Sequence, residues 1–172
     1  MFEDKVILVD VNDNQIGLMP KLEAHEKGAL HRAFSVFIFN KHGELMLQKR
    51  SLGKYHSPGL WTNTCCSHQR DGESNITSGK RRLNEEMGFE TTLIEKTSFI
   101  YQAKFDNGLT EHEFDHILVG YYDKPPNINS DEVDSWKWMS MNNVQDDINE
   151  SPENYTAWFK IIFKKYYKFI SQ

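Results

Sequence analysis

The sequence predicts a mixed α/β fold in a single domain, a β-sheet sandwich flanked by helices. Three observations support this prediction: a length of 172 residues, strand-like segments on both sides of one helical segment, and a second helical segment near the C-terminus. A chain of this length can enclose one proper hydrophobic core. With 38% hydrophobic and 26% charged residues, the composition is that of an ordinary globular protein. Residues 1–172 are therefore expected to form one domain.

The first third of the chain predicts strands separated by polar segments. Residues 5–17 predict a strand, a turn and the start of a second strand. Residues 22–31 are polar and predict a loop. Residues 33–51 combine an apolar run, a Gly-containing turn and an alternating segment, which together predict a β-hairpin. The Gly- and Pro-containing segment 53–63 predicts a loop.

The remaining elements are two helices and three strands. Ile76, Leu83 and Met87 share one side of a predicted helix over 75–87, and Gly88 is its stop signal. The later strands are expected at 97–105, 111–122 and 136–141, with a polar loop at 123–134 and a final amphipathic helix at 153–170. This last helix could lie on a membrane surface, but packing on the sheet is the favoured interpretation.

Charge and hydropathy exclude several classes of function. The net charge of −5 offers no general basis for binding nucleic acid. The longest apolar run, 33–39, is too short to span a bilayer, and the N-terminal segment lacks the pattern of a secretory signal. We therefore expect a cytoplasmic protein, a monomer or weak dimer, with a small-molecule partner and neither a nucleic-acid nor a membrane partner. In a reducing compartment its two cysteines stay as thiols.

The most specific motif is the segment 67–89, "SHQRDGESNITSGKRRLNEEMGF". It resembles the Nudix box, G-x5-E-x7-R-E-U-x-E-E-x-G-U, a loop–helix–loop that holds a divalent metal against a diphosphate. Ser67 stands where the first Gly belongs, and Arg82 replaces the Glu of "RE". The matching positions are Glu73, Arg81, Leu83, Glu85, Glu86, Gly88 and Phe89.

The replacement at Arg82 has a chemical consequence. Carboxylates on one helical face bind Mg²⁺, which bridges phosphate oxygens. Arg82 and Glu86 are four residues apart and share a face. Arginine at this position removes a metal-binding carboxylate and adds a phosphate-binding cation. A diphosphate would still be held, while multi-metal hydrolysis is weakened. The alternative is a solvated helix with an ion pair.

Histidines and acids suggest a second metal site. His25 and His31 lie in one polar segment, His68 follows the cysteines, and Glu111 and Glu113 project from the same face of a strand. Two neighbouring carboxylates repel unless a cation or proton separates them. Three His and two Glu suit Zn²⁺, Mn²⁺ or Mg²⁺.

Taken singly, each histidine is more often a surface or hydrogen-bonded residue than a ligand. This ordinary role is expected for His42, His56 and His116.

The segment "NTCCSH" contains both cysteines. If it is extended, Cys66 and His68 share a face and Cys65 points the other way. Adjacent residues of a strand cannot converge on one ion, which disfavours a Cys₂His zinc cluster. Cys65 is expected to be a small core residue. Next to a metal-bound histidine, Cys66 would be in an electropositive setting that favours its thiolate.

Together, "TNTCCSH", the degenerate Nudix box and "EHEFDHIL" resemble the type-1 isopentenyl-diphosphate isomerases over essentially the whole chain. The resemblance implies a Nudix-like sandwich and the interconversion of isopentenyl and dimethylallyl diphosphate through a tertiary carbocation. By the same resemblance, Cys66 and Glu113 are the acid and base, with Tyr101 hydrogen-bonding near Glu113. The implied metal ligands are His25, His31, His68, Glu111 and Glu113.

The resemblance also implies how the substrate is held. Trp158 would lie beside the isoprenoid tail, and Trp61 is a further candidate for the pocket wall. Glu86 and the backbone carbonyl of Cys66 would hold a Mg²⁺ against the diphosphate. Gln69 stands where the family usually has Pro, which affects loop rigidity rather than the reaction. The implied diphosphate-binding cations are Lys21, Arg50, Lys54 and Arg82.

Two other functions fit part of this pattern. A Nudix hydrolase that cleaves a nucleoside or isoprenoid diphosphate is disfavoured by Arg82 in place of a carboxylate, and it would leave Cys66, His68 and Glu113 without an explanation. A metal-binding or diphosphate-sensing module would have no need for an acid and a base that face one another. Phosphate release from a diphosphate separates the hydrolase from the isomerase.

Overall fold

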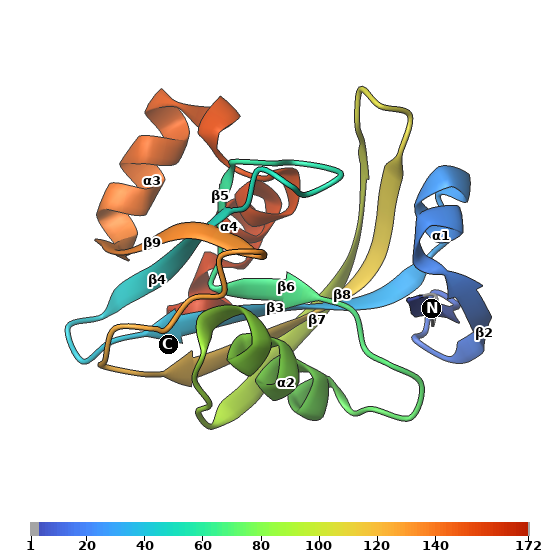
Figure 1. Ribbon diagram of the computed structural model, residues 1–172, viewed down its shortest axis with the longest axis horizontal. Coiled ribbons are helices and arrows are strands. Elements are labelled where there is room, and N and C mark those ends of the chain that lie inside the picture. Colours follow the sequence, from blue (N-terminus) through green and yellow to red (C-terminus); the bar gives the residue numbers. More distant parts are fainter. Residues whose placement is uncertain (1–3, 172) are drawn as a thin grey trace.

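The computed structural model describes residues 4–171, so the outermost residues of the expected 1–172 domain, 1–3 and 172, lie outside the described residues. Within that range, nine strands join into one mixed sheet with helices on both sides (Figure 1). The elements, in order, are β1 (Lys5–Val9), β2 (Gln15–Pro20), α1 (Lys21–Lys27), β3 (His31–Phe39), β4 (Glu44–Arg50), β5 (Trp61–Thr62), β6 (Cys65–Ser67), α2 (Asn75–Met87), β7 (Leu93–Lys104), β8 (Thr110–Tyr121), β9 (Val133–Ser140), α3 (Met141–Glu150), a 3₁₀ turn (Pro152–Asn154) and α4 (Ala157–Ile170).

Strand β3 is the centre of the sheet. It pairs in parallel with β8, from His31 opposite Glu113 to Phe39 opposite Tyr121. On its other side it pairs antiparallel with the short strand β6, where Ser35 lies opposite Cys66. Strand β8 continues antiparallel into β7, and β4 pairs with β9 and β5. The long segments β3 and β8 are therefore held side by side although about 80 residues separate them in sequence.

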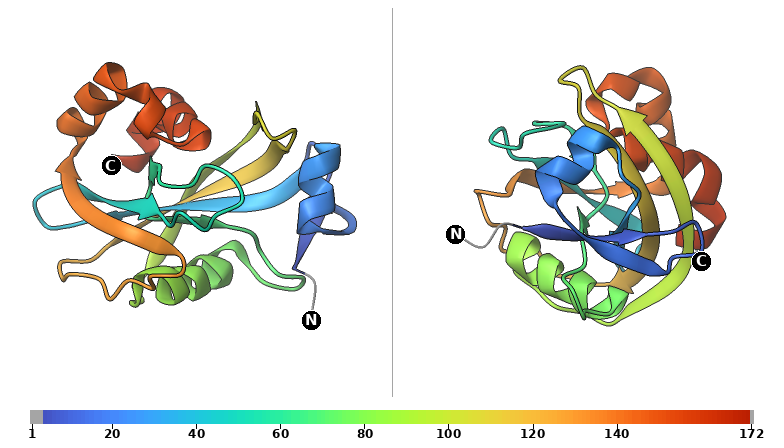
Figure 2. Two further views of the ribbon diagram at one scale, coloured as in Figure 1. Left: turned by 45° about the horizontal axis from the view of Figure 1, so that its top comes forward. Right: turned by 90° about the vertical axis from the view of Figure 1, so that its right-hand side faces the viewer.

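Two hydrophobic cores lie on opposite faces of the sheet. Phe34, Val36 and Ile38 of β3 point into the core beneath α2, whereas Phe37 and Phe39 point into the core beneath α4. This alternation is the two-residue period of a strand that is buried on both faces. Figure 2 shows α2 on one side of the sheet and α3 and α4 on the other.

The predicted helix over 75–87 is confirmed at both ends. The side chain of Ser74 caps it by accepting a hydrogen bond from the backbone N–H of Thr77 at 3.1 Å. Gly88 ends it in the left-handed conformation, with φ of 72° and its N–H bonded to the carbonyl of Asn84. Gly79 faces the sheet, where a Cβ would come within 2.6 Å of Leu118. A glycine therefore lets α2 approach the sheet closely.

Two expectations about local structure are corrected, and one helix was missed. The segment predicted as a loop over 22–31 contains α1, whose buried Ala24 and His25 pack inward and whose end is set by Gly28 in the left-handed conformation. Helix α3 was not predicted, although Met141, Val144 and Ile148 have helical spacing. The expected hairpin over 33–51 has its turn, but β3 and β4 pair only at Phe39 opposite Leu45, because β8 and β9 are their main partners.

The predicted C-terminal helix packs on the sheet, as its apolar face indicated. Trp158, Phe159, Ile162 and Phe163 of α4 are buried in the core of that side. Among residues 4–171, none of the helices combines the length and apolarity needed to cross a membrane.

Replacing Gly88 with Ala is expected to lower the free energy of unfolding by about 2–4 kcal/mol. The left-handed backbone costs about 1–2 kcal/mol for a residue with a Cβ, and overpacking adds about 1–3 kcal/mol. The clash is specific, because a Cβ at Gly88 would lie 2.2 Å from the carbonyl oxygen of Asn127. Urea denaturation measures the change. Gly43→Ala is the matched control: it has φ of 73° and nothing within 4 Å, so it should lose only the backbone component. Equal losses in both variants would contradict the steric argument.

Candidate active site

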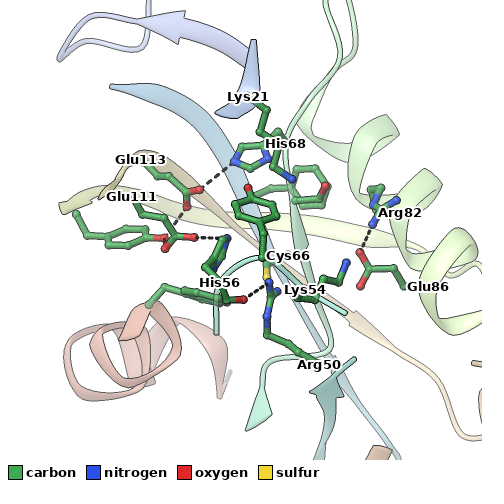
Figure 3. Close-up of a pocket in the computed structure, with 15 residues that line it drawn as sticks. Lys21, Arg50, Lys54, His56, Cys66, His68, Arg82, Glu86, Glu111 and Glu113 are labelled. Carbon is green, nitrogen blue, oxygen red and sulfur yellow. Dashed lines mark hydrogen bonds and ion pairs between the residues drawn. The ribbon is translucent and has the colours of Figure 1, made fainter. Parts of the chain in front are cut away.

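A deep pocket opens between α2, α4, the loop 51–60 and the adjoining ends of β3, β6 and β8. Figure 3 shows Cys66 inside it, between Glu111 and Glu113 on one side and Arg82 and Glu86 on the other. Most of the predicted site residues line this pocket: Lys21, Arg50, Lys54, Cys66, His68, Arg82, Glu86, Tyr101, Glu111, Glu113 and Trp158. His25 and His31 are fully buried beside His68, in the wall next to the pocket.

Trp61, unlike most of the predicted site residues, does not line the pocket. Its strand β5 pairs with β4, and its ring lies beneath the ammonium of Lys137, 4.2 Å from the ring centre. The rest of the ring packs against the core under α4. The expectation that Trp61 forms a pocket wall is therefore corrected: the residue supports the core and a cation–π contact.

The three predicted histidine ligands converge on Glu113. His25 Nδ1 lies 2.7 Å from the carbonyl of Lys21, and His31 Nδ1 lies 2.8 Å from that of Ala29. Each carbonyl fixes a proton on Nδ1 and leaves Nε2 as the free electron pair, as in histidines that bind metals. His31 Nε2 is 3.2 Å from His68 Nε2, which is 3.0 Å from Glu113 Oε1.

This donor set fits a divalent cation. The ligand atoms of His25, His31, His68 and Glu113 all lie within 4.8 Å of one another. His25 Nε2 is buried and has no hydrogen-bond partner among the described residues. Burial lowers the pKa of His68 to about 3, although Glu113 acts in the opposite direction. Neutral imidazoles with converging lone pairs are suited to Zn²⁺ or Mn²⁺.

Glu111 and Glu113 share one hydroxyl. Tyr101 Oη lies 2.8 Å from Glu111 Oε2 and 2.6 Å from Glu113 Oε2, and all three side chains are buried. A phenol carries a single proton, so it can donate to only one carboxylate at a time. Burial and the charge of Glu113 hold the pKa of Glu111 well above its usual range. Burial alone would also raise the pKa of Glu113, but the contacts of Glu113 with His31 and His68 hold that pKa well below its usual range.

The two cysteines have separate environments, as predicted. Cys65 is fully buried in the core under α2, while Cys66 projects from the other face of β6 into the pocket. Both are free thiols. Burial raises the pKa of the Cys66 thiol, and the positive charge of Arg50 offsets this only in part. Burial therefore favours the thiol form of Cys66.

Four cations line the same pocket. Lys21, Arg50, Lys54 and Arg82 come from α1, β4, the following loop and α2, and all line the pocket. Burial, and after it the charge of Lys54, lowers the pKa of Lys21. So many cations at short range stabilise an anion with several oxygens, such as a diphosphate.

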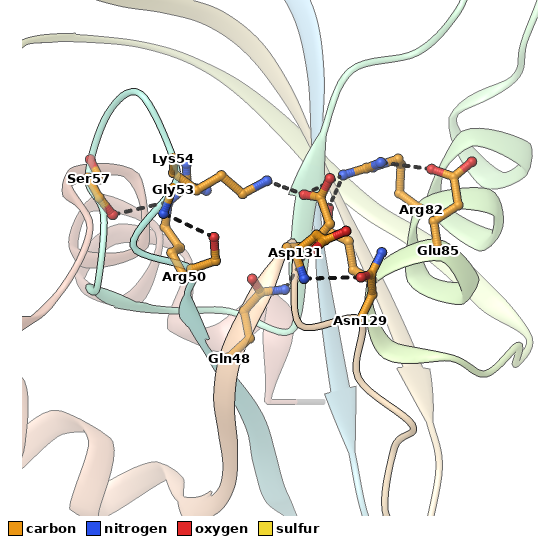
Figure 4. A network of polar contacts seen from close by, with 12 residues as sticks. Gln48, Arg50, Gly53, Lys54, Ser57, Arg82, Glu85, Asn129 and Asp131 are labelled. Carbon is orange, nitrogen blue, oxygen red and sulfur yellow. Dashed lines mark hydrogen bonds and ion pairs between the residues drawn. The ribbon is translucent and has the colours of Figure 1, made fainter.

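Glu132 lies between two of these cations in the absence of a ligand. Its carboxylate forms ion pairs with Lys54 and, at 3.2 Å, with Arg82. Figure 4 shows Lys54 and Arg82 in this polar network, with Glu85 beside Arg82. Arg82 also contacts Glu85 at 2.7 Å and Glu86 at 2.5 Å, which confirms the shared helical face. Sequence reasoning missed Glu132 because it lies in the predicted polar loop 123–134, where no motif distinguishes one acid from the others.

The Glu73–Arg81 pair of the Nudix-like motif has a structural role. Arg81 binds both oxygens of Glu73, at 2.7 and 2.8 Å, and this hydrogen-bonded pair lowers the pKa of Glu73 to about 2. Arg81 also donates to the backbone carbonyl of His68 at 3.3 Å. The motif thus ties the loop that presents His68 to helix α2.

Trp158 and His56 complete the pocket. Trp158 is 2% exposed, and the guanidinium of Arg50 lies 5.2 Å from its ring centre. His56 was expected to have an ordinary surface or hydrogen-bonding role, yet it lines the pocket with its Nε2 3.4 Å from Glu111 Oε1. His56 lies in a loop, where no periodic pattern of residues predicts a position in the pocket. Burial, reinforced by Arg50, lowers the pKa of His56 to about 3, so its imidazole is neutral at pH 7.

Adding Zn²⁺ or Mn²⁺ to metal-free protein is expected to raise its melting temperature. At a hundredfold excess over Kd, binding stabilises the folded state by about 2.7 kcal/mol, or roughly 5–10 °C for a chain of this size. Differential scanning calorimetry checks this. His68→Ala should lose most of the shift, because His68 connects His31 with Glu113. His42→Ala, at an exposed turn, is the control and should keep it. A shift of equal size in both variants would place the ion elsewhere.

Comparisons with known proteins identify the family of this chain. A family model described as the NUDIX domain matches residues 29–159. The isopentenyl-diphosphate Delta-isomerase 2 of Aromatoleum aromaticum is 51% identical over 91% of this chain and 82% of its own length. The isopentenyl-diphosphate Delta-isomerase of Serratia proteamaculans is 49% identical over 94% of this chain and 90% of its own length.

Solved structures support the fold. A crystal structure of a protein from Deinococcus radiodurans superposes with a TM-score of 0.78 at 17% identity, covering 94% of this chain and 98% of the other. A MutT protein from Methanosarcina mazei superposes with a TM-score of 0.66 at 17% identity, covering 81% and 94%. The predicted Nudix-like fold is thereby confirmed. The chain belongs to the isopentenyl-diphosphate Delta-isomerases that are built on the Nudix domain.

Proposed function

We propose that this chain converts isopentenyl diphosphate to dimethylallyl diphosphate by metal-dependent protonation and deprotonation through a tertiary carbocation, as a step of isoprenoid biosynthesis. The observation that carries the proposal is one pocket in which Cys66 faces the pair Tyr101–Glu113, with four cations beside them, in a chain of the isomerase family. From the sequence alone we also propose a cytoplasmic location, a monomer or weak dimer, and neither nucleic acid nor membrane as a partner.

The reaction needs one acid and one base. The terminal alkene carbon gains a proton, which leaves a tertiary carbocation, and the neighbouring methylene then loses a proton to form the new double bond. Cys66 and Glu113 are proposed for these two transfers. Without a ligand, burial keeps the thiol of Cys66 protonated while Glu113 is held as a carboxylate. The pair thus contains one proton donor and one acceptor, and Tyr101 orients Glu113 by its hydrogen bond.

The proposed metal ligands are His25, His31, His68, Glu111 and Glu113, which would hold Mn²⁺, Zn²⁺ or Mg²⁺. A bound ion would offset the repulsion of the two carboxylates and adjust the acidity of the groups that it binds. Glu86, with the carbonyl of Cys66, is proposed to hold a Mg²⁺ against the diphosphate. Since both Glu86 oxygens are engaged, by Arg82 at 2.5 Å and Gln48 at 2.8 Å, Arg82 would turn from Glu86 to the diphosphate when Mg²⁺ binds.

Four cations are proposed to hold the diphosphate, and the ring of Trp158 is proposed to protect the carbocation. Lys21, Arg50, Lys54 and Arg82 are proposed to grip its oxygens, and Arg82 replaces a carboxylate that hydrolysis would use. The face of Trp158 lies in the same pocket, where a π system stabilises a carbocation. The burial of Trp158 at the start of α4 would also keep water from the cation.

Incubation with isopentenyl diphosphate and Mg²⁺ in D₂O tests the proposed function. The expected product is dimethylallyl diphosphate that carries deuterium, with no release of phosphate, because the protein transfers protons and cleaves no P–O bond. NMR detects the deuterium and a phosphate assay detects hydrolysis. Release of phosphate without a deuterated product would instead identify a hydrolase.

Cys66→Ala and Glu113→Gln are each expected to lower kcat by at least about 10³-fold, since general acid–base catalysis contributes about 10²–10⁴-fold and neither transfer has a substitute. Binding of isopentenyl diphosphate, measured by calorimetry, should survive, because the cations are untouched. Cys65→Ala is the matched control, since Cys65 lies on the opposite face of β6 in the core. Near wild-type turnover in either variant would disprove the acid–base assignment.

Treatment with a strong chelator is expected to abolish turnover, and Mg²⁺ together with Zn²⁺ or Mn²⁺ should restore it. The reason is that, without the ion, no cation separates the neighbouring acids Glu111 and Glu113, and the acidity of Glu113 is no longer adjusted for proton transfer. The isomerisation rate before and after dialysis measures this, with bound metal counted by mass spectrometry. An unchanged rate in metal-free protein would refute the metal requirement.

A further inference from the structure

His56 contacts the proposed metal site without being one of its predicted ligands. Its Nε2 lies 3.4 Å from Glu111 Oε1, and both side chains are buried. We infer that His56 is a positioning residue, whose Nε2 contacts the Glu111 carboxylate and orients it toward the bound ion. This inference deepens the proposed function, because it rests on the metal site proposed there.

Glu111 needs a second partner because its first one is shared. Its Oε2 lies 2.8 Å from Tyr101 Oη, but the same hydroxyl lies 2.6 Å from Glu113. When the single phenolic proton goes to Glu113, Glu111 has no donor on that side. His56 faces the other oxygen of Glu111, and an Nε2–H there is a donor that Glu113 does not compete for. Partners of this kind orient carboxylate ligands in metal sites.

The imidazole of His56 is held by its surroundings. It stacks on Phe105, with ring centres 5.1 Å apart and planes at 15°. Tyr55 and Trp158 meet its ring at steep angles, 84° and 82°. The carbonyl of His56 accepts a hydrogen bond from Arg50 at 3.2 Å, which anchors the loop as well. A ring confined in this way keeps its Nε2 directed at Glu111 with little entropy left to lose.

Direct coordination by His56 is the less favoured arrangement. His25, His56 and Glu111 do form a second group of ligand atoms within 4.8 Å of one another. However, this group shares His25 with the first, and His25 has only Nε2 free, because its Nδ1 contacts the carbonyl of Lys21. One lone pair binds one ion. The first group, His25, His31, His68 and Glu113, offers four ligand atoms, whereas the group that contains His56 offers three. The ion is therefore expected in the first group, with His56 in contact with Glu111.

Metal affinity tests the inference independently of turnover. Isothermal titration of metal-free protein with Zn²⁺ or Mn²⁺ should give a Kd about 10–100-fold weaker in His56→Phe than in wild type, the usual cost of losing such a partner. Phe keeps the stacking on Phe105 and removes the nitrogen. His56→Gln places an amide N–H near the position of Nε2 and should recover part of the affinity. His42→Phe, at an exposed turn, is the control and should match wild type.

The outcomes separate three cases. Wild-type affinity in His56→Phe would overturn the inference and leave His56 as a packing residue. The absorption spectrum of Co²⁺-loaded protein should keep its band positions and intensities in His56→Phe; a change in coordination number would make His56 a ligand and overturn the positioning role. If the wild-type chain itself bound neither ion, the proposed metal site would be wrong, and the inference would fail with it for a reason unrelated to His56.

Discussion

The site depends on the parallel pairing of β3 with β8. This pairing places His31 directly opposite Glu113, and the antiparallel pairing of β7 with β8 places Tyr101 opposite Glu113 on the other side. A ligand, the central carboxylate and its hydroxyl partner therefore come from three adjacent strands at one level of the sheet. Because side chains alternate between faces, a shift of one residue in either register would turn the acids away from the pocket.

The sheet directs some residues into a core on one face and others into the pocket on the opposite face. Within β6, Cys65 fills the core under α2 and Cys66 enters the pocket under α4, although the two residues are adjacent. Strand β8 divides its residues in the same way, with Glu111 and Glu113 on the pocket side and Phe114 on the other face. Cys66, Glu111 and Glu113 are thus attached to strands of the sheet and not to loops, which limits their conformational freedom.

The Nudix-like motif has two roles that differ in kind. Its Glu73–Arg81 pair secures the loop before α2, and through the carbonyl of His68 it also positions a proposed metal ligand. Arg82 instead adds positive charge at the pocket, where it is balanced by Glu86 and Glu132 while no anion is bound. One helix therefore supports the acid–base side of the site and the diphosphate side. The exchange of a carboxylate for arginine is consistent with holding a diphosphate without cleaving it.

The sequence by itself determined the fold class, the limits of α2 and the opposed faces of the two cysteines, because these follow from periodicity, capping residues and alternation within short segments. It also identified most pocket residues through motifs whose chemistry needs those side chains. Only the tertiary structure decided that Trp61 lies outside the pocket, that residues 21–27 are helical, and that His56 and Glu132 belong to the site. These features depend on contacts between segments far apart in the chain, and no local pattern encodes which loop will meet which strand.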